Sequence, residues 1–114
     1  LDLHNGTKFR YAWAVCSALT TMPQLDLSKG TEFTETWAGC SALTTLGGFG
    51  AIKESFDLQS CPLTVDSIMN VITQAADLNS LGLTGKTMKF GSTNLNKLTD
   101  EQKAVATSKG WTLA

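Results

Sequence analysis

The chain has 114 residues, of which 42% are hydrophobic and 17% charged, as expected for one folded domain and not for a disordered segment. Nine Lys and Arg residues against ten Asp and Glu give a formal net charge of −1, which provides no general attraction to nucleic acid or to an anionic membrane. No stretch approaches the roughly 18 apolar residues that a membrane-spanning helix needs. We therefore expect a single domain that neither binds nucleic acid nor inserts into a membrane.

The first half of the chain contains an internal repeat with a period of 24 residues. When residues 1–22 are placed over residues 25–46, 14 of the 22 positions are identical. The spacing Leu19-x-x-Met22-x-x-Leu25-x-Leu27 also follows the skeleton of leucine-rich repeats, whose period is roughly 20 to 29 residues. The sequence therefore predicts one solenoid domain over residues 1–114. Two short repeats fill residues 1–48, and longer repeats fill residues 49–114.

Five apolar-polar-apolar triplets predict the strands of this domain. They occupy residues 1–3, 25–27, 56–58, 88–90 and 111–113. Successive side chains of a strand point to opposite faces, so the central residue of each triplet should point outward. The central residues are 24, 31, 32 and 23 positions apart, and we interpret them as five rungs of one parallel sheet. The predicted fold class is α/β: a leucine-rich-repeat solenoid with about five short parallel strands on one face, and with short helical turns and two longer helices on the other.

The two short repeats are expected to contain short helical turns. Phe9, Trp13 and Cys16 have the spacing i, i+4, i+7, and the same residue types recur within residues 33–40. This spacing favours one or two helical turns that bury all three side chains. The glycines within residues 47–50 lie where the period lengthens, and they indicate a junction between two repeat types rather than a domain boundary.

Two longer helices are predicted in the second half. The first covers about residues 65–78, begins after the capping residue Thr64 and carries an apolar stripe that should pack on the sheet. The second covers about residues 100–109 and begins with a capping box formed by Thr99 and Gln102. A glycine directly after its last turn should end it.

Few residues could support catalysis. His4 is the only histidine and would lie on a terminal strand, which argues against a Ser-His-Asp or Cys-His arrangement. Cys16, Cys40 and Cys61 form no Cys-x-x-Cys pair and have no histidine at metal-ligand spacing, so we expect free thiols that pack in the core. The sequence therefore predicts a protein that is not an enzyme and that holds no metal or cofactor.

The units with the pattern LDLxxGTxFxxxWAxCSALTT, the segments 60–64 and 91–95, and the C-terminal LTDEQKAVATSKGWTLA point to a known group. They resemble bacterial surface leucine-rich-repeat proteins of the BspA-like, Treponema-type group, including phage-borne relatives. The resemblance covers essentially the whole chain. It implies a leucine-rich solenoid, displayed on a cell or virion surface for adhesion or partner binding, and it transfers no catalytic residues.

One position departs from the usual leucine-rich repeat. Asn or Cys ordinarily occupies the sixth position of the LxLxxNxL pattern, where its side chain bonds the backbone of adjoining turns. Here this position holds Gly6, Gly30, Cys61 and Thr93, and Asn94 follows one residue too late. An asparagine ladder is therefore not expected.

The outward positions of the predicted sheet are the candidate binding surface, because solenoid proteins usually bind partners on their concave face. The candidate residues are Asp2, His4, Asp26, Ser28, Asp57, Gln59 and Lys89. One interpretation is a solvated face on which the repeat has copied its aspartates. The other is an acidic patch that receives a basic partner or a cation.

The favoured function is a non-catalytic, surface-exposed module for protein binding or adhesion, at the bacterial cell surface or outside the cell. The partner would be a protein or another cell-surface ligand. Alternatives are a structural or receptor-binding part of a phage or virion tail, and an intracellular leucine-rich adaptor or inhibitor, which free cysteines favour because thiols persist in a reducing cytosol. The chain opens on a predicted strand without a polar cap, so we expect a piece of a longer protein that can associate with itself through its first repeat.

Overall fold

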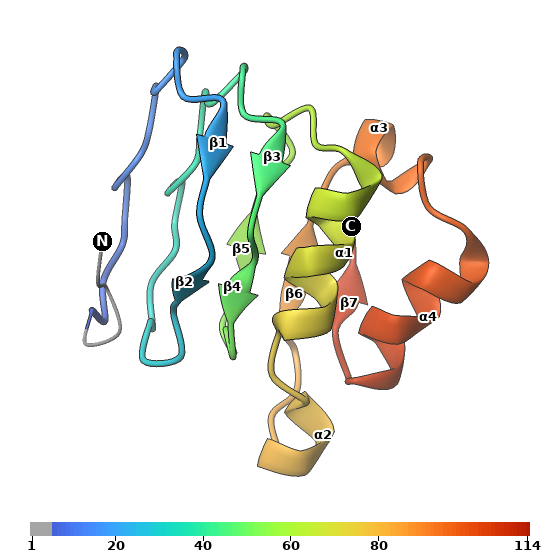
Figure 1. Cartoon of the computed structure of the whole chain (residues 1–114). Coiled ribbons are helices and arrows are strands. Elements are labelled where there is room, and N and C mark those ends of the chain that lie inside the picture. The colour runs from blue at the N-terminus through green and yellow to red at the C-terminus, as the bar shows by residue number, and fades with distance from the viewer. Residues whose placement is uncertain (1–5) are drawn as a thin grey trace.

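The structure is a computed structural model and describes residues 6–114. It combines short strands with helices (Figure 1), and the strands that pair are parallel to each other. In chain order the elements are β1 (Thr21–Met22), β2 (Leu25–Asp26), β3 (Thr45–Leu46), β4 (Phe49–Gly50), β5 (Phe56–Asp57), α1 (Val65–Gln74), α2 (Leu78–Leu81), β6 (Thr87–Lys89), α3 (Ser92–Leu95), α4 (Asp100–Ser108) and β7 (Thr112–Leu113). The strand predicted at residues 1–3 lies outside the described residues.

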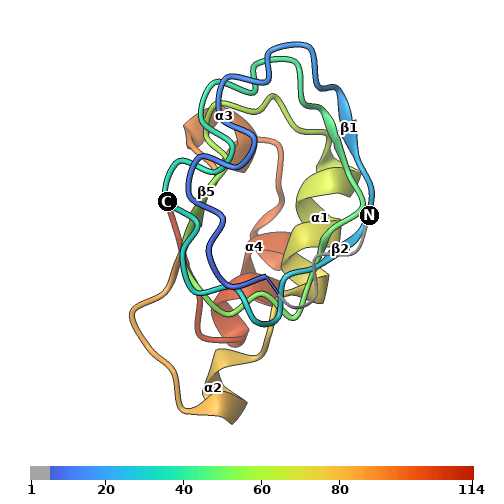
Figure 2. The same cartoon turned by 90° about the vertical axis from the view of Figure 1, so that its left-hand side faces the viewer.

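The first two windings of the chain, residues 1–24 and 25–48, lie side by side where they are described, with a constant offset of 24 residues. Thr21 pairs with Thr45, Leu25 pairs with Phe49, and an isolated parallel bridge joins Lys8 to Glu32. Figure 2 shows the windings as nested traces around a common interior. One period of the sequence repeat therefore corresponds to one winding of the chain.

Aromatic rings stack along the interior at the same offset. Phe9 stacks on Phe33 with ring centroids 5.4 Å apart, and Trp13 stacks on Trp37 at 5.8 Å. Trp37 in turn stacks at 4.7 Å on Phe49, in the third winding, which begins at residue 49. Stacked pairs of this kind contribute about 0.5–1.5 kcal/mol beyond the burial of their area. The repeated Phe and Trp positions therefore hold the windings in register from inside.

The expected single sheet of five strands is wrong. In the described part of the chain β1 pairs with β3, β2 pairs with β4, and only β5, β6 and β7 form a sheet of three. Asp26 lies beside Gly50 and not beside Asp57, because the 24-residue offset continues into the third winding. The sequence Phe49-Gly50-Ala51 lacks the apolar-polar-apolar pattern, so β4 could not be recognised from that pattern. The last three triplets do share one sheet, as predicted.

The expected helical turns in the short repeats are also wrong. Residues 10–15 and 34–39 are successive turns, with left-handed backbone at Tyr11, Val15, Glu35 and Gly39. A residue with positive φ interrupts a right-handed helix. In the first winding every second N–H, from Phe9 to Val15, instead donates to a carbonyl of the second winding. The side chains expected to be buried are buried in the second repeat, whereas Trp13 of the first repeat is only half-buried.

The two longer helices begin where the sequence predicts. The hydroxyl of Thr64 accepts a hydrogen bond from the backbone of Ser67 at the start of α1. Thr99 and Gln102 form the expected capping box at the start of α4. Helix α1 ends at Gln74, four residues earlier than predicted, because Ala75 adopts an extended conformation.

Polar side chains of α1 take the place of a strand beside β3. Ser67 Oγ accepts a hydrogen bond from Leu46 N at 2.9 Å and donates one to Thr44 O at 3.0 Å. Asn70 Nδ2 donates to Leu46 O, and Gln74 Nε2 donates to Gly47 O. These positions lie at i, i+3 and i+7, on one stripe of the helix. The stripe supplies the hydrogen bonds that a neighbouring strand would otherwise make with β3.

The C-terminal end of α1 is hydrogen-bonded to residues that follow the last helix, α4. Lys109, directly after α4, donates from Nζ to the carbonyls of Ile72, Thr73 and Ala75. The indole of Trp111 donates to Ala76 O at 3.0 Å. The last carbonyls of a helix have no partner within the helix, so these contacts satisfy groups that would otherwise need water.

We predict that Ser67→Ala lowers the free energy of unfolding by about 1–3 kcal/mol, because it leaves the buried N–H of Leu46 without its partner. Urea unfolding followed by tryptophan fluorescence measures the change. Thr73→Ala is the matched control, since Thr73 is exposed on the same helix, and it should change stability by less than about 0.5 kcal/mol. Equal effects of the two substitutions would contradict the role given to Ser67.

Candidate functional site

The structure separates the candidate residues that the sequence placed on one face. Asp57, Gln59 and Lys89 lie on or directly after β5 and β6, where Asp57 pairs with Lys89. Asp26 and Ser28 belong to the opposite side of the winding, as the positions of β2 and β5 in Figure 2 show. The predicted column of stacked aspartates therefore does not form between Asp26 and Asp57. The two remaining candidates, Asp2 and His4, lie outside the described residues.

Both described aspartates of the repeat have a local structural role. Asp26 Oδ1 accepts a hydrogen bond from the backbone N of Ser28 at 3.0 Å, and Asp57 Oδ1 accepts one from Gln59 N at 2.9 Å. Such contacts fix the turn that follows a strand. The recurrence of Asp at this place is thus explained in part by turn formation, without any ligand.

A groove of about 440 Å³ lies between residues 31–35 of the second winding and residues 54–57 of the third. The buried rings of Phe33 and Phe56 contribute apolar lining, and both strands β5 and β6 contribute one wall. A smaller hollow continues the groove along Gln59 and Ser60. The polar lining residues of the groove are Thr31, Glu32, Thr34, Glu35, Glu54, Ser55, Asp57, Thr87 and Lys89.

The groove opens because the third winding does not continue the hydrogen-bond pattern of the first two. In the first winding, Phe9 N donates to Glu32 O at 2.8 Å and Tyr11 N donates to Thr34 O at 3.1 Å. The equivalent N–H groups, 24 residues later, belong to Phe33 and Glu35, and neither has a partner within residues 6–114. After β5 the chain turns through Cys61 and Pro62 and lacks the Trp-Ala-x-Cys turns of the short repeats. The two neighbouring segments therefore separate.

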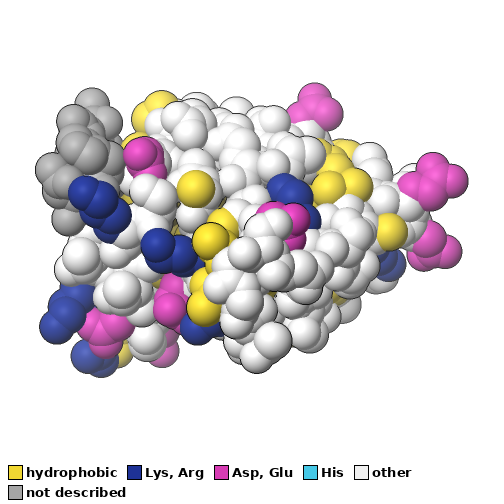
Figure 3. Space-filling view, turned by 90° about the horizontal axis from the view of Figure 1, so that it is seen from below, with side chains coloured by type: hydrophobic (Ala, Val, Ile, Leu, Met, Phe, Trp, Pro, Cys, Tyr) yellow, Lys and Arg dark blue, Asp and Glu magenta, His cyan; other side chains and the backbone are white. Residues whose placement is uncertain are grey.

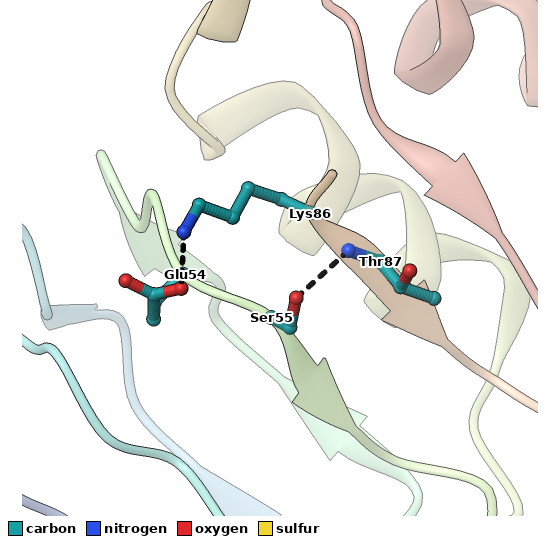
Figure 4. A network of polar contacts seen from close by, with 4 residues as sticks. All are labelled: Glu54, Ser55, Lys86 and Thr87. Carbon is teal, nitrogen blue, oxygen red and sulfur yellow. Dashed lines mark hydrogen bonds and ion pairs between the residues drawn. The ribbon is translucent and has the colours of Figure 1, made fainter. Parts of the chain in front are cut away.

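An ion pair and a hydrogen bond stabilise one wall of the groove. Lys86 Nζ lies 2.6 Å from Glu54 Oε1, and Thr87 N donates to Ser55 Oγ at 2.9 Å (Figure 4). Both contacts join the chain just before β5 to the start of β6. They hold residues 54 and 55 in place as part of the lining.

Negative charge predominates around the groove. Four carboxylates and one lysine line it, and of the four only Glu54 has an ion-pair partner among the described residues. Viewed from below, basic and acidic side chains lie together at one end of that face, and mainly acidic ones at the other (Figure 3). The whole chain has a formal net charge of only −1, so the excess of carboxylates among the lining residues is local to the groove. Sequence analysis did not identify Glu32 and Glu35 as site residues. The 24-residue offset could have found them, because it places residues 32–35 beside residues 56–59, which include β5.

The cysteines and Asn94 form a ladder of hydrogen bonds between windings. Cys40 Sγ donates to Trp13 O at 2.9 Å, and Cys61 Sγ approaches Trp37 O at 4.0 Å. The buried amide of Asn94 then donates to Cys61 O at 2.8 Å and accepts from Leu63 N at 3.1 Å. The sequence predicts no asparagine ladder, but it does not reveal that the single residue Asn94 reaches the preceding winding from the short helix α3.

Burial makes these thiols poor nucleophiles. It raises the pKa of Cys61 from 9.0 to about 12, with smaller contributions from Cys40 and Asp57, and it also raises the pKa of Cys40. Thiolates carry the reactivity of cysteine, so protonated, buried thiols act here as hydrogen-bond donors in the ladder. Within residues 6–114 no three His, Cys, Asp or Glu side chains are arranged to hold a metal ion, and no helix is long and apolar enough to cross a membrane.

Comparison with known proteins gives no relative: no protein-family model, curated protein or solved structure matches the chain.

We predict that stability falls as the pH rises above about 9. The folded state keeps the Cys61 proton up to about pH 12, whereas the unfolded chain loses it near 9.0, so unfolding releases a proton in this range. The contribution of Cys61 to the free energy of unfolding therefore decreases by about 1.4 kcal/mol per pH unit. Urea unfolding at pH 8, 9, 10 and 11 measures it.

Cys61→Ala isolates this effect, because the two proteins differ only in the thiol. The stability difference between the wild type and Cys61→Ala should shrink steadily above pH 9. Ser60→Ala, at the exposed residue next to Cys61, serves as the control and should keep the wild-type slope. Parallel pH profiles for the wild type and Cys61→Ala would show that the thiol is not held protonated.

Proposed function

We propose that the chain is a non-catalytic leucine-rich-repeat module of the α/β solenoid class that binds protein partners or mediates adhesion, at the bacterial cell surface or outside the cell. The 24-residue register, the short parallel strands and the ladder of Cys40, Cys61 and Asn94 support the repeat class. The groove beside β5 is the single observation that carries the binding role.

The groove has the features of a recognition site. Its volume of about 440 Å³ lies within the approximately 300–1,000 Å³ typical of ligand sites, and it combines buried aromatic rings with polar groups at the rim. Three of its carboxylates, those of Glu32, Glu35 and Asp57, are called the acidic rim. This rim would select partners with basic side chains, since complementary charge raises both specificity and the rate of association. Of the candidates from the sequence, Asp57 and Lys89 line this groove and Gln59 lines its continuation.

The same groove would serve the alternative roles. A part of a phage or virion tail could use it to bind a receptor, and an intracellular adaptor could use it to bind a basic segment. The thiol donors of the ladder favour the intracellular alternative to the extent that they require reduced cysteines. Binding through the groove is common to all three, so it is the property to test.

We predict that neutralising the rim with Glu32→Gln, Glu35→Gln and Asp57→Asn strongly reduces partner capture. The immobilised chain is exposed to an extract of bacterial and host surface proteins, and bound proteins are quantified by mass spectrometry. Proteins retained by the wild type should fall by at least about tenfold with the rim variant, because the complementary charges are lost.

A control variant with the same change in charge is Asp66→Asn, Asp100→Asn and Glu101→Gln, at exposed positions on α1 and α4. It should retain the wild-type set of bound proteins. The proposal fails if the two variants lose the same proteins, or if neither loses any.

A further inference from the structure

We propose that the groove accepts an extended basic peptide, which adds as a strand to the open edge of β5. This inference rests on the proposed binding function and specifies its partner class. Strand addition is a general mode of peptide recognition in which backbone hydrogen bonds give affinity and alternate side chains give specificity.

Strand β5 offers a free edge to the groove. It is the outer strand of the sheet β5-β6-β7, and on its other side Leu58 N donates to Lys89 O of β6. Alternate residues of a strand direct their backbone groups to opposite sides, so the N–H and carbonyl of Asp57 face away from β6. The groove reaches this edge, since residues 31–35, which lie outside the sheet β5-β6-β7, form its opposite wall. It also extends over Thr87 and Lys89 of β6.

The opposite wall supplies further backbone donors. The N–H groups of Phe33 and Glu35 have no acceptor in the described chain, and both residues line the groove. Their equivalents Phe9 and Tyr11 donate to carbonyls of the second winding. The carbonyls of a bound peptide would therefore occupy the place that the next winding occupies elsewhere.

Side chains of the groove specify the pattern of the peptide. Phe33 and Phe56 line its apolar part, while Glu32, Glu35 and Asp57 leave an excess of negative charge over the single Lys89. Because strand side chains alternate between two faces, one set would contact the rings and the other the carboxylates. The fitting sequence thus alternates β-branched apolar residues with Lys or Arg.

The test uses a fluorescent peptide of sequence Lys-Val-Lys-Val-Lys-Val with blocked ends, measured by anisotropy against the whole chain. The acidic peptide Glu-Val-Glu-Val-Glu-Val should bind at least about tenfold more weakly, because it meets the carboxylate rim. The basic peptide methylated on alternate backbone nitrogens should also bind at least about fivefold more weakly, since it cannot donate to the β5 edge.

Protein variants locate the site. Glu32→Gln with Glu35→Gln should weaken binding of the basic peptide by at least about fivefold, whereas Asp100→Asn with Glu101→Gln should change it by less than about twofold. Unfolding midpoints of both variants establish that they are folded. Equal binding of the methylated and unmethylated peptides would overturn strand addition, and equal loss with both double variants would overturn the location.

Failure of this inference can be told apart from failure of the proposed function. If the basic peptide does not bind while the rim variant still loses its captured proteins, the groove binds partners by another mode and strand addition is wrong. If neither peptide nor protein binding depends on the rim, both proposals fall.

Discussion

Hydrogen bonding from one winding of the chain to the next is the constraint on which the structure depends. Each winding is too short to bury its own backbone groups, so these groups must find partners one winding later. Between the first two windings the backbone itself supplies the partners, at an offset of 24 residues. Further along, side chains of α1 and the amide of Asn94 take over that task. The groove lies where the N–H groups of Phe33 and Glu35 find no such partner in the described chain.

This constraint explains which parts of the fold could be predicted from the sequence. Helices α1 and α4 begin at Thr64 and Thr99, whose caps are local signals that need no knowledge of neighbours. The partner of β2 could not be recognised in the same way. Phe49-Gly50-Ala51 carries no alternating pattern, and only the repeat offset indicates that Gly50 lies beside Asp26. The i, i+4, i+7 spacing of the short repeats was misleading because left-handed residues at Tyr11 and Val15 give the same spacing without a helix.

The candidate site was predicted in part for the same reason. Asp57, Gln59 and Lys89 were found because β5 and β6 follow the triplet pattern and pair with each other. Glu32 and Glu35 were missed, since assigning all triplets to one sheet placed Asp26 beside Asp57 and left no room there for residues 32–35. A polar residue that bonds the backbone of a neighbouring winding, as Ser67 and Asn94 do, is hidden from sequence patterns because its partner is distant in the chain.

Site-directed cross-linking tests the 24-residue register most directly. Thr21→Cys with Thr45→Cys places two exposed thiols on adjacent parallel strands, where neighbouring residues lie about 5 Å apart. Asp26→Cys with Asp57→Cys places them on opposite sides of the winding. If the 24-residue register holds, a short bismaleimide joins the first pair within one chain and leaves the second pair unjoined, as judged by peptide mass spectrometry. Efficient cross-linking of positions 26 and 57, without cross-linking of 21 and 45, would contradict it.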